Sequence, residues 1–329
     1  MKLSDQEEQA MRYRKLGRTG LEVSELGFGA WGISGQAWIG ADDAESLRAL
    51  RLAIEHGVNF LDTAYAYGEG HSERLVGAVV RDSAEAVYVA SKVPPKNMEW
   101  PARPGLRPEE VFPAEWIVAC TEGSLQNLGL ETIDVQQLHV WSDEWVGQGD
   151  WLDAIERLKR EGKIRFFGVS INDHQPENAI RLVESGVVDT VQVIYNIFDQ
   201  SPEDVLFAAV EAAGVGVIVR VPLDEGGLTG SVRPETTFPE GDFRNGYFAG
   251  ERKREVWDRV QAIARDLDIE VEQLAECALR FCLSHQATDV VIPGMRSTRN
   301  VERNVRAASA GPLGDNQLTT LRRHRWHTL

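Results

Sequence analysis

Apolar and polar residues follow two periods along this chain, and together they predict a repeating unit of helix, glycine and strand. In residues 43–56, apolar positions such as Leu50 and Ile54 recur at helical spacing, with charged residues between them. Gly57 is suited to end this helix, and an apolar strand follows at 58–61. The same order recurs in four further units, with helices at 114–128, 150–161, 176–185 and 203–213 followed by Gly129, Gly162, Gly186 and Gly214.

Eight short apolar strands complete these units. Helices at 72–80 and 272–284 precede strands without the glycine, and the helix at 203–213 is expected to begin in the capping box Ser201-Pro202-Glu203-Asp204. Because short apolar strands that alternate with helices are typical of a parallel sheet covered on both faces, eight such units predict an α/β fold, the (β/α)8 TIM barrel. The strands are expected near residues 27, 60, 89, 136, 167, 192, 218 and 291.

Two segments lie outside the repeat. Residues 12–24, with Gly17 and Gly20 around a turn, predict an N-terminal β-hairpin. Residues 223–250 form the longest irregular stretch, and loops of that length are usually functional. We therefore expect long loops at the C-terminal face of the barrel.

Composition narrows the class of protein and its partners. The 329 residues are interpreted as one barrel domain over 1–329, with a loose start at 1–11 and a C-terminal tail at 309–329. A net charge of -16 argues against nucleic acid or an anionic membrane as partner, so the expected partner is a small molecule. The absence of a secretory signal or a long apolar run, and three cysteines predicted to be free and buried, predict a cytoplasmic protein.

Polar residues follow the predicted strands where an active site forms on such a barrel. Asp62 ends the second strand, and Tyr67, Lys92 and His139 follow strand ends. A carboxylate can hold an ammonium, the ammonium can lower the pKa of a phenol, and an imidazole can orient a carbonyl, so these residues suit carbonyl reduction. Each also has a simpler interpretation: Asp62 as a turn cap, Lys92 as a surface lysine, His139 as a core histidine, and Tyr67 as a packing residue with Tyr65 as its rival.

Residues 13–304 resemble the aldo-keto reductase superfamily, in its bacterial type. The resemblance is carried by Asp62-Thr63-Ala64-Tyr65-Ala66-Tyr67-Gly68, followed by Glu73 and Gly77. It implies that Asp62, Tyr67, Lys92 and His139 are the catalytic tetrad, which selects Tyr67 over Tyr65. It also implies a nicotinamide cofactor, NADP(H) rather than NAD(H), and no metal.

The resemblance assigns cofactor contacts to several segments of the chain. Two positions depart from the family pattern: Ile171 replaces the usual asparagine, and Arg220 stands where an aromatic ring usually faces the nicotinamide, a position in which a guanidinium can also stack. Arg296 is the expected partner of a 2′-phosphate, with a surface arginine as the alternative. The full expected set is Gly29, Ala30, Trp31, Asp62, Ser170, Asn172, Gln192, Arg220, Pro222, Leu223, Gly227, Leu228, Gly230, Gly294, Arg296, Asn300 and Asn304.

Substrate contacts are expected from Trp31, Tyr67, His139 and Trp141, with Trp100 and Trp145 also near the barrel mouth. The segment 27–32 matches G-x-G-x-x-G, but no helical pattern follows it directly, so it is interpreted as a loop that lines the substrate pocket.

The resulting prediction is an NADPH-dependent enzyme that reduces aldehydes or ketones, with Tyr67 as proton donor. The alternatives are a sugar or alcohol dehydrogenase working in the oxidising direction and a weakly active NADPH-binding regulatory subunit. A metal-dependent hydrolase is disfavoured because the histidines are not closely paired outside the tail.

Overall fold

A closed barrel of eight parallel strands forms the centre of the molecule, as the sequence predicts. The computed structural model describes residues 10–326. Neighbouring strands pair in chain order from β3 to β10, and the bridges Leu26 with Val291 and Gly29 with Gly294 close the ring. The strands are β3 (Phe28–Gly29), β4 (Phe60–Asp62), β5 (Tyr88–Val93), β6 (Ile133–Leu138), β7 (Ile164–Ser170), β8 (Thr190–Ile194), β9 (Gly216–Arg220) and β10 (Val290–Val291).

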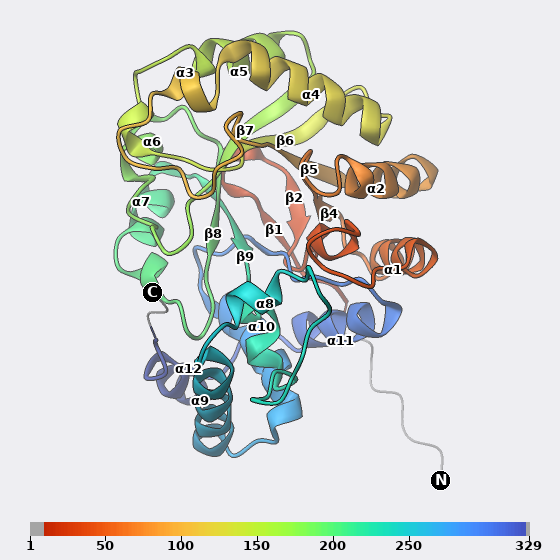
Figure 1. Ribbon diagram of the computed structural model, residues 1–329, viewed down its shortest axis with the longest axis vertical. Coiled ribbons are helices and arrows are strands. Elements are labelled where there is room, and N and C mark those ends of the chain that lie inside the picture. The colour runs from red at the N-terminus through yellow and green to blue at the C-terminus, as the bar shows by residue number, and fades with distance from the viewer. Residues whose placement is uncertain (1–9, 327–329) are drawn as a thin grey trace.

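Helices surround the barrel on its outside (Figure 1). Those that alternate with the strands are α1 (Asp43–Glu55), α2 (His71–Asp82), α4 (Ala114–Leu128), α5 (Trp151–Arg160), α6 (Ile180–Ser185), α7 (Leu206–Ala213) and α10 (Leu274–Ser284). Further helices are α3 (Pro108–Val111), α8 (Arg244–Tyr247), α9 (Arg252–Leu267), α11 (Thr298–Ser309) and α12 (Asp315–Arg322). The expected C-terminal tail begins where α11 ends and contains α12. Its final residues 327–329 lie outside the described chain, as do residues 1–9 of the expected loose start.

Two predicted helix starts were wrong. The segment that begins at Ser201 is a short 3-10 turn, η4 (Ser201–Glu203), and α7 begins only at Leu206. Both the amide and the hydroxyl of Ser201 donate to Oδ1 of Asp199, so the serine closes a local turn instead of capping a helix. Likewise α6 begins at Ile180, because Asn178 is bonded to the backbone of the neighbouring loop at Trp141 and at Asp143.

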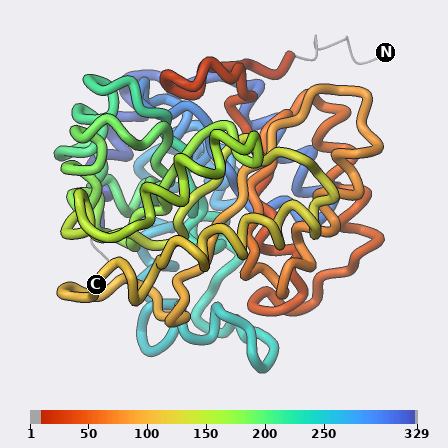
Figure 2. The backbone as a smooth tube through the Cα atoms, turned by 90° about the horizontal axis from the view of Figure 1, so that it is seen from above, coloured from red at the N-terminus to blue at the C-terminus, as the bar shows by residue number. Residues whose placement is uncertain are grey.

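The N-terminal hairpin covers one end of the barrel. Strands β1 (Tyr13–Lys15) and β2 (Glu22–Ser24) pair antiparallel. Figure 2 shows this red hairpin at one end of the molecule and the cyan segment that includes the long loop at the opposite end. The hairpin contributes to a separate apolar cluster that fills this end of the barrel, made of Leu16, Leu21, Val23, Phe60, Ala90, Val135, Ile218, Val290 and Ile292. Because this end of the described barrel is filled, a ligand site is expected at the opposite end.

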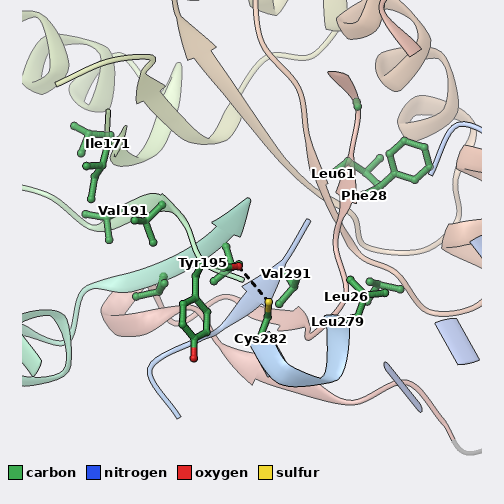
Figure 3. Packing of buried hydrophobic residues seen from close by; sticks show 14 of the residues in the cluster. Leu26, Phe28, Leu61, Ile171, Val191, Tyr195, Leu279, Cys282 and Val291 are labelled. Carbon is green, nitrogen blue, oxygen red and sulfur yellow. Dashed lines mark hydrogen bonds between the residues drawn. The ribbon is translucent and has the colours of Figure 1, made fainter. Parts of the chain in front are cut away.

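The larger core lies between the strands and the surrounding helices. Figure 3 shows part of it, where the thiol of Cys282 on α10 donates to the carbonyl oxygen of Tyr195, the residue after β8, at 3.2 Å. Cys120, Cys277 and Cys282 are all free and buried, as predicted. Burial of these thiols and of the large apolar side chains around them fixes the strands relative to the helices.

The long loop after β9 lies across the open end. It contains the 3-10 segment η5 (Asp224–Thr229) and helix α8. The amide of Phe243 donates to the carbonyl oxygen of Ala37 at 2.8 Å, and the amide of Ile39 donates to Oδ2 of Asp242 at 3.2 Å. The loop after β9 and the loop after β3 are thus bonded to each other at the barrel mouth. None of the helices within residues 10–326 has the length and apolar character needed to span a membrane.

Candidate active site

Lys92 lies at the centre of a buried polar cluster at the carboxyl ends of the strands. Its Nζ donates to Oδ1 of Asp62 at 2.5 Å, to the carbonyl oxygen of Thr63 at 2.8 Å and to the hydroxyl of Tyr67 at 3.4 Å. The side chains of Lys92 and Asp62 are 0% and 3% exposed. Because β4 and β5 are neighbours in the sheet, residues far apart in sequence are brought together at their ends.

Two glutamines hold the second oxygen of Asp62. Nε2 of Gln137 lies 3.1 Å from Oδ2 of Asp62, and Nε2 of Gln192 lies 2.8 Å from the same atom. Gln192 was expected to contact the cofactor, and Gln137 was not among the expected site residues. A signal for Gln137 was present, because it precedes His139 by two residues, and such positions face the same side of a strand.

The structure separates the two rival tyrosines. The hydroxyl of Tyr67 meets Lys92, whereas the ring of Tyr65 packs toward α4, where a Cβ on Gly123 would lie 2.7 Å from it. Tyr67 also stacks obliquely on Trp31, with ring centroids 6.3 Å apart, and meets His139 edge to face at 5.6 Å. Tyr67 is therefore the phenol that faces the polar cluster.

The charge states of the cluster follow from burial and from close partners. Burial raises the pKa of Tyr67 above its ordinary value, although the Lys92 ammonium acts in the opposite direction. The ammonium lowers this pKa, as expected, but desolvation of the phenolate is the larger effect. For Lys92, burial lowers the pKa, but Asp62 and Tyr67 outweigh it and the net pKa is raised. At neutral pH the cluster therefore holds an ammonium and a protonated phenol.

His139 is a neutral imidazole. Burial, together with the positive charges of Lys92 and Arg220, moves its pKa well below the usual range. Its backbone amide donates to the carbonyl oxygen of Val93 at 2.9 Å, and its buried Nδ1 has no hydrogen-bond partner among residues 10–326. A neutral imidazole can donate one hydrogen bond to a substrate oxygen without adding charge.

A cavity of about 1040 Å³ opens above this cluster at the barrel mouth. Most of the residues expected to bind cofactor line it: Gly29, Ala30, Trp31, Asp62, Ser170, Asn172, Gln192, Arg220, Pro222, Leu223, Gly294, Arg296 and Asn300. The expected contacts Gly227, Leu228, Gly230 and Asn304 are not part of its wall, and Leu228 is fully buried. In η5, the wall is formed instead by Glu225, Gly226 and Thr229.

The wall has free groups suited to a nicotinamide dinucleotide. The buried Nε of Arg220 has no hydrogen-bond partner within the described residues. At Gly294, a Cβ atom would meet no other atom within 4 Å, so a ligand can approach the backbone there. Ser170 and Gln192 add polar side chains on adjacent strands. The residues present therefore fit a large polar cofactor.

The family pattern is broken at Ile171, which is followed by Asn172, and at Arg220. The amide of Asn172 bonds to the backbone amide and carbonyl of Ala102, so this side chain is used to hold the loop after β5. Arg220 stays in the cavity wall, where its Nη2 donates to the carbonyl oxygen of Ile171 at 2.8 Å and to Oδ1 of Asp173 at 2.6 Å.

Arg296 lies on the cavity wall beside an aromatic ring. Its Nη1 donates to the carbonyl oxygen of Ile39 at 3.1 Å, and it forms no salt bridge with any of the described carboxylates. Its guanidinium lies 5.9 Å from the ring centroid of Trp38, and Arg244 lies over the same ring at 4.2 Å. Unlike Arg296, Arg244 is paired with Asp242.

Aromatic side chains form the rest of the mouth. Trp31 contacts Trp38 and Phe243, with centroids 6.0 Å and 4.9 Å apart, and Trp100 meets His139 at 5.8 Å. Phe243 and Trp38, which sequence analysis missed, come from loops with no regular pattern. Trp141 and Trp145 are 0% and 1% exposed and pack against each other, away from the cavity wall.

No cluster of three His, Cys, Asp or Glu side chains able to hold a metal ion is present in residues 10–326. The site instead joins a buried ammonium, a carboxylate, a phenol and a neutral imidazole below a cavity large enough for a dinucleotide and a small substrate. On a (β/α)8 barrel, such a site defines an oxidoreductase that acts on carbonyl or alcohol groups.

The chain belongs to the aldo/keto reductase family, whose model matches residues 25–325. It is therefore an NAD(P)H-dependent oxidoreductase. It is 29% identical over 297 residues to aldo-keto reductase YhdN of Bacillus subtilis. The matched segment covers 89% of this chain and 87% of that protein.

Solved structures agree with this assignment. The holo form of aldo-keto reductase AKR11C1 from Bacillus halodurans superimposes with a TM-score of 0.74 at 28% identity, covering 96% of each chain. The glycerol dehydrogenase AKR11B4 from Gluconobacter oxydans gives a TM-score of 0.73 at 26% identity, covering 98% of each chain.

Proposed function

We propose that this chain uses NADPH to reduce aldehyde or ketone groups to alcohols, with Tyr67 as the proton donor. The observation that carries the proposal is the contact of the Tyr67 hydroxyl with Nζ of Lys92 at 3.4 Å, with Asp62 holding that ammonium. When bound, the cofactor supplies the hydride that the carbonyl carbon accepts.

Residues of the protein supply the proton for the carbonyl oxygen and stabilise the negative charge that this transfer leaves on Tyr67. Because its pKa is raised, Tyr67 is protonated at neutral pH and can give its proton to the carbonyl oxygen. The phenolate left behind lies next to Lys92, whose positive charge stabilises it. His139, neutral at the same pH, orients the carbonyl oxygen by a hydrogen bond. Asp62 keeps Lys92 in position throughout.

Cofactor contacts are proposed for the expected residues that line the cavity, apart from Asn172, whose amide holds Ala102, with Arg296 as the partner of the 2′-phosphate. The proposal for Arg296 is supported by its position in the wall and its lack of a carboxylate partner among the described residues. A guanidinium in this state is free to form a paired hydrogen bond with a phosphate. These features favour NADPH over NADH.

Substrate contacts are proposed for Trp31, Tyr67 and His139, together with Trp100 and Phe243. The last two are 44% and 38% exposed, although both are large apolar side chains on the cavity wall. Exposed aromatic groups around a pocket are typical of ligand contact. Trp141 is not included, since its side chain is fully buried and is not part of the cavity wall.

Oxidation of alcohols is the second candidate, because one similar structure is titled a glycerol dehydrogenase. The same residues serve both directions, with the Tyr67 phenolate as base in the oxidation.

The test is NADPH absorbance with a panel of aldehydes, ketones and sugars, and NADP⁺ reduction with the matching alcohols. Tyr67→Phe is the key variant, and loss of a general acid is expected to lower kcat by about 100-fold or more. NADPH affinity, measured by protein fluorescence, should stay near that of the wild type. Full activity of Tyr67→Phe would contradict the mechanism.

A further inference from the structure

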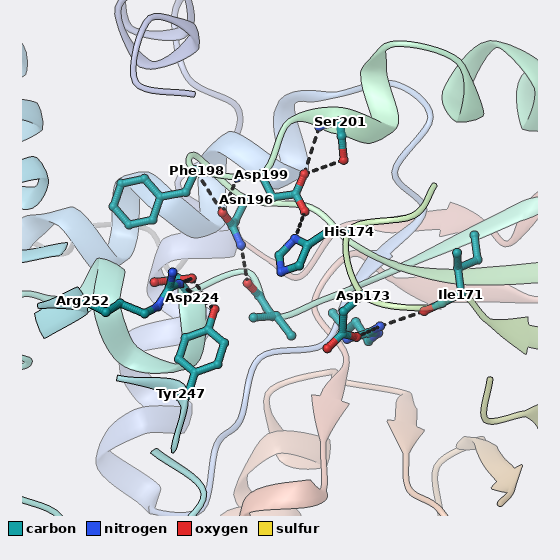
Figure 4. A network of polar contacts seen from close by, with 12 residues as sticks. Ile171, Asp173, His174, Asn196, Phe198, Asp199, Ser201, Asp224, Tyr247 and Arg252 are labelled. Atoms are coloured by element: carbon teal, nitrogen blue, oxygen red, sulfur yellow. Dashed lines mark hydrogen bonds and ion pairs between the residues drawn. The ribbon is translucent and has the colours of Figure 1, made fainter. Parts of the chain in front are cut away.

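The loop after β7 directs two neighbouring side chains to different partners. Oδ1 of Asp173 accepts a hydrogen bond from Nη2 of Arg220 at 2.6 Å, and Nδ1 of His174 lies 2.5 Å from Oδ2 of Asp199 (Figure 4). His174 has a φ of 57°, in the left-handed region that non-glycine residues rarely adopt. Such a conformation persists only where surrounding contacts hold it, so this segment is positioned by its partners.

Arg220 is a fixed cation in the wall of the cavity. The carbonyl oxygen of Ile171 and the carboxylate of Asp173 share its Nη2, and its side chain is 19% exposed. Its charge contributes to lowering the pKa of His139, after burial and Lys92. The guanidinium therefore acts electrostatically on the reacting end of the site.

The contact with Asp173 cannot by itself fix Arg220. The side chain of Asp173 is 67% exposed, and an ion pair with so exposed a partner contributes little because water screens it. Ile171 is held at the end of β7, because its amide donates to the carbonyl oxygen of Gln192 at 2.9 Å, but the position of Asp173 depends on another anchor in the same loop.

His174 supplies that anchor. Asp199 is 5% exposed and also accepts hydrogen bonds from the amide and the hydroxyl of Ser201. Its own amide donates to Oδ1 of Asn196, whose side chain donates to the carbonyl oxygen of Val221, the residue after Arg220. The loops that follow β7, β8 and β9 are thus joined through His174 and Asp199, as Figure 4 shows.

We propose that His174 is a positioning residue: its pairing with Asp199 holds Asp173 where, together with the carbonyl oxygen of Ile171, it fixes the Arg220 guanidinium, and this cation makes the site favour reduced over oxidised cofactor. The proposal rests on the proposed function, in which a nicotinamide cofactor binds in this cavity. The oxidised nicotinamide ring carries a positive charge and the reduced ring does not. A fixed guanidinium in a partly desolvated wall therefore repels only the oxidised form.

Protonation of His174 strengthens the anchor. The hydrogen bond to Asp199 raises the pKa of His174 more than burial lowers it, and Asp173 raises it further while Arg220 lowers it. A raised histidine pKa means that the ion pair is fully present below the usual value of about 6.5 and is lost as pH rises through the folded-state pKa. Burial is the main reason that the pKa values of Asp224 and Glu225, in the adjoining η5, are raised to about 6 and about 8. These two carboxyls therefore titrate in the same pH range as His174.

The test measures the dissociation constants of NADP⁺ and NADPH by protein fluorescence and compares their ratio between variants. Wild type is expected to bind NADPH more tightly, and His174→Ala to reduce this preference by about fivefold. His174→Asn, which tolerates the left-handed backbone, is expected to lower the preference less and to remove the part of its pH dependence due to His174. His324→Asn is the matched control. His324 lies in the C-terminal tail and also pairs with an aspartate, since its Nε2 lies 3.0 Å from Oδ2 of Asp266 on α9.

A second variant separates positioning from general loosening of the loop. Arg220→Met is expected to abolish the preference for reduced cofactor, and adding His174→Ala to it should change the ratio no further. The proposal is overturned if His174→Ala leaves the ratio of the two dissociation constants unchanged, which includes the case in which binding of both cofactors weakens by the same factor. It is also overturned if His174→Ala still alters this ratio in the Arg220→Met background. Failure of the wild type to bind either cofactor would instead overturn the proposed function on which it rests.

Discussion

Nζ of Lys92 and Oδ1 of Asp62 lie 2.5 Å apart, with both side chains almost completely buried. Each of these two buried charges is stabilised by the other, because removing one would leave the other with neither a counter-charge nor water around it. The strands β4 and β5 supply one partner each, so the pair is both a structural contact of the barrel and the support of Tyr67.

Removal of the charge on Asp62 is therefore expected to destabilise the protein. Asp62→Asn should lower the free energy of unfolding by about 3–5 kcal/mol, because it leaves the Lys92 ammonium buried without a counter-charge. Urea unfolding followed by circular dichroism measures this. Asp43→Asn is the control: Asp43 pairs with His71 but its side chain is 56% exposed, and its loss should change stability by no more than about 0.5 kcal/mol. Equal stability of Asp62→Asn and wild type would refute the prediction.

The buried neutral His139 makes stability fall in mild acid. Because the pKa of His139 is held well below its usual range in the folded state, the unfolded chain takes up a proton at this residue near pH 6.5 and the folded chain does not. Its contribution therefore lowers stability as pH falls below about 6.5, by up to about 1.4 kcal/mol per pH unit. Unfolding titrations at pH 7.5 and pH 5.5 should show a smaller loss for His139→Gln than for wild type. The same loss in both proteins would contradict this.

Arg296 is expected to discriminate between the two nicotinamide cofactors. Arg296→Ala should weaken NADPH binding by about tenfold to hundredfold, since a hydrogen bond between charged groups contributes about 1.5–3 kcal/mol, and should change NADH binding little. Titration of protein fluorescence gives both dissociation constants. Arg299→Ala is the control, because Arg299 lies three residues after Arg296, in the first turn of α11, and is exposed and absent from the cavity wall. If Arg296→Ala weakens both cofactors equally, the assignment is wrong.

Gly77 is expected to tolerate no side chain. It lies on α2, where a Cβ atom would be 2.0 Å from the carbonyl oxygen of Leu128 at the end of α4. Gly77→Ala should therefore force the two helices apart, at a loss of about 1–3 kcal/mol and a lower Tm. Gly246→Ala on α8, where no atom lies within 4 Å of the added Cβ, should leave Tm the same or slightly higher. A Tm for Gly77→Ala at or above that of wild type would contradict the packing argument.

Local sequence signals were sufficient for the architecture of the barrel. The period of apolar residues and the glycines after the helices predict each β-strand of the ring, because burial on both faces requires a continuous apolar run. Glycines such as Gly129 and Gly186 end their helices in the left-handed conformation, as the pattern indicates. The start of α7 was mispredicted because Asp199, a residue outside the predicted helix, bonds to Ser201.

The sequence by itself determined the barrel, the family and the place of Asp62, Lys92 and His139 at strand ends, with Tyr67 in the turn that follows, because strand ends of a parallel barrel meet at one face whatever the loops do. Only the tertiary structure decided which side chains complete that face. It brings Gln137 to Asp62, buries Trp141 and commits Asn172 to a loop. It also pairs Arg220 with Asp173, and His174 with Asp199. These outcomes depend on contacts between residues far apart in sequence and on competition for hydrogen bonds in space, which no local period encodes.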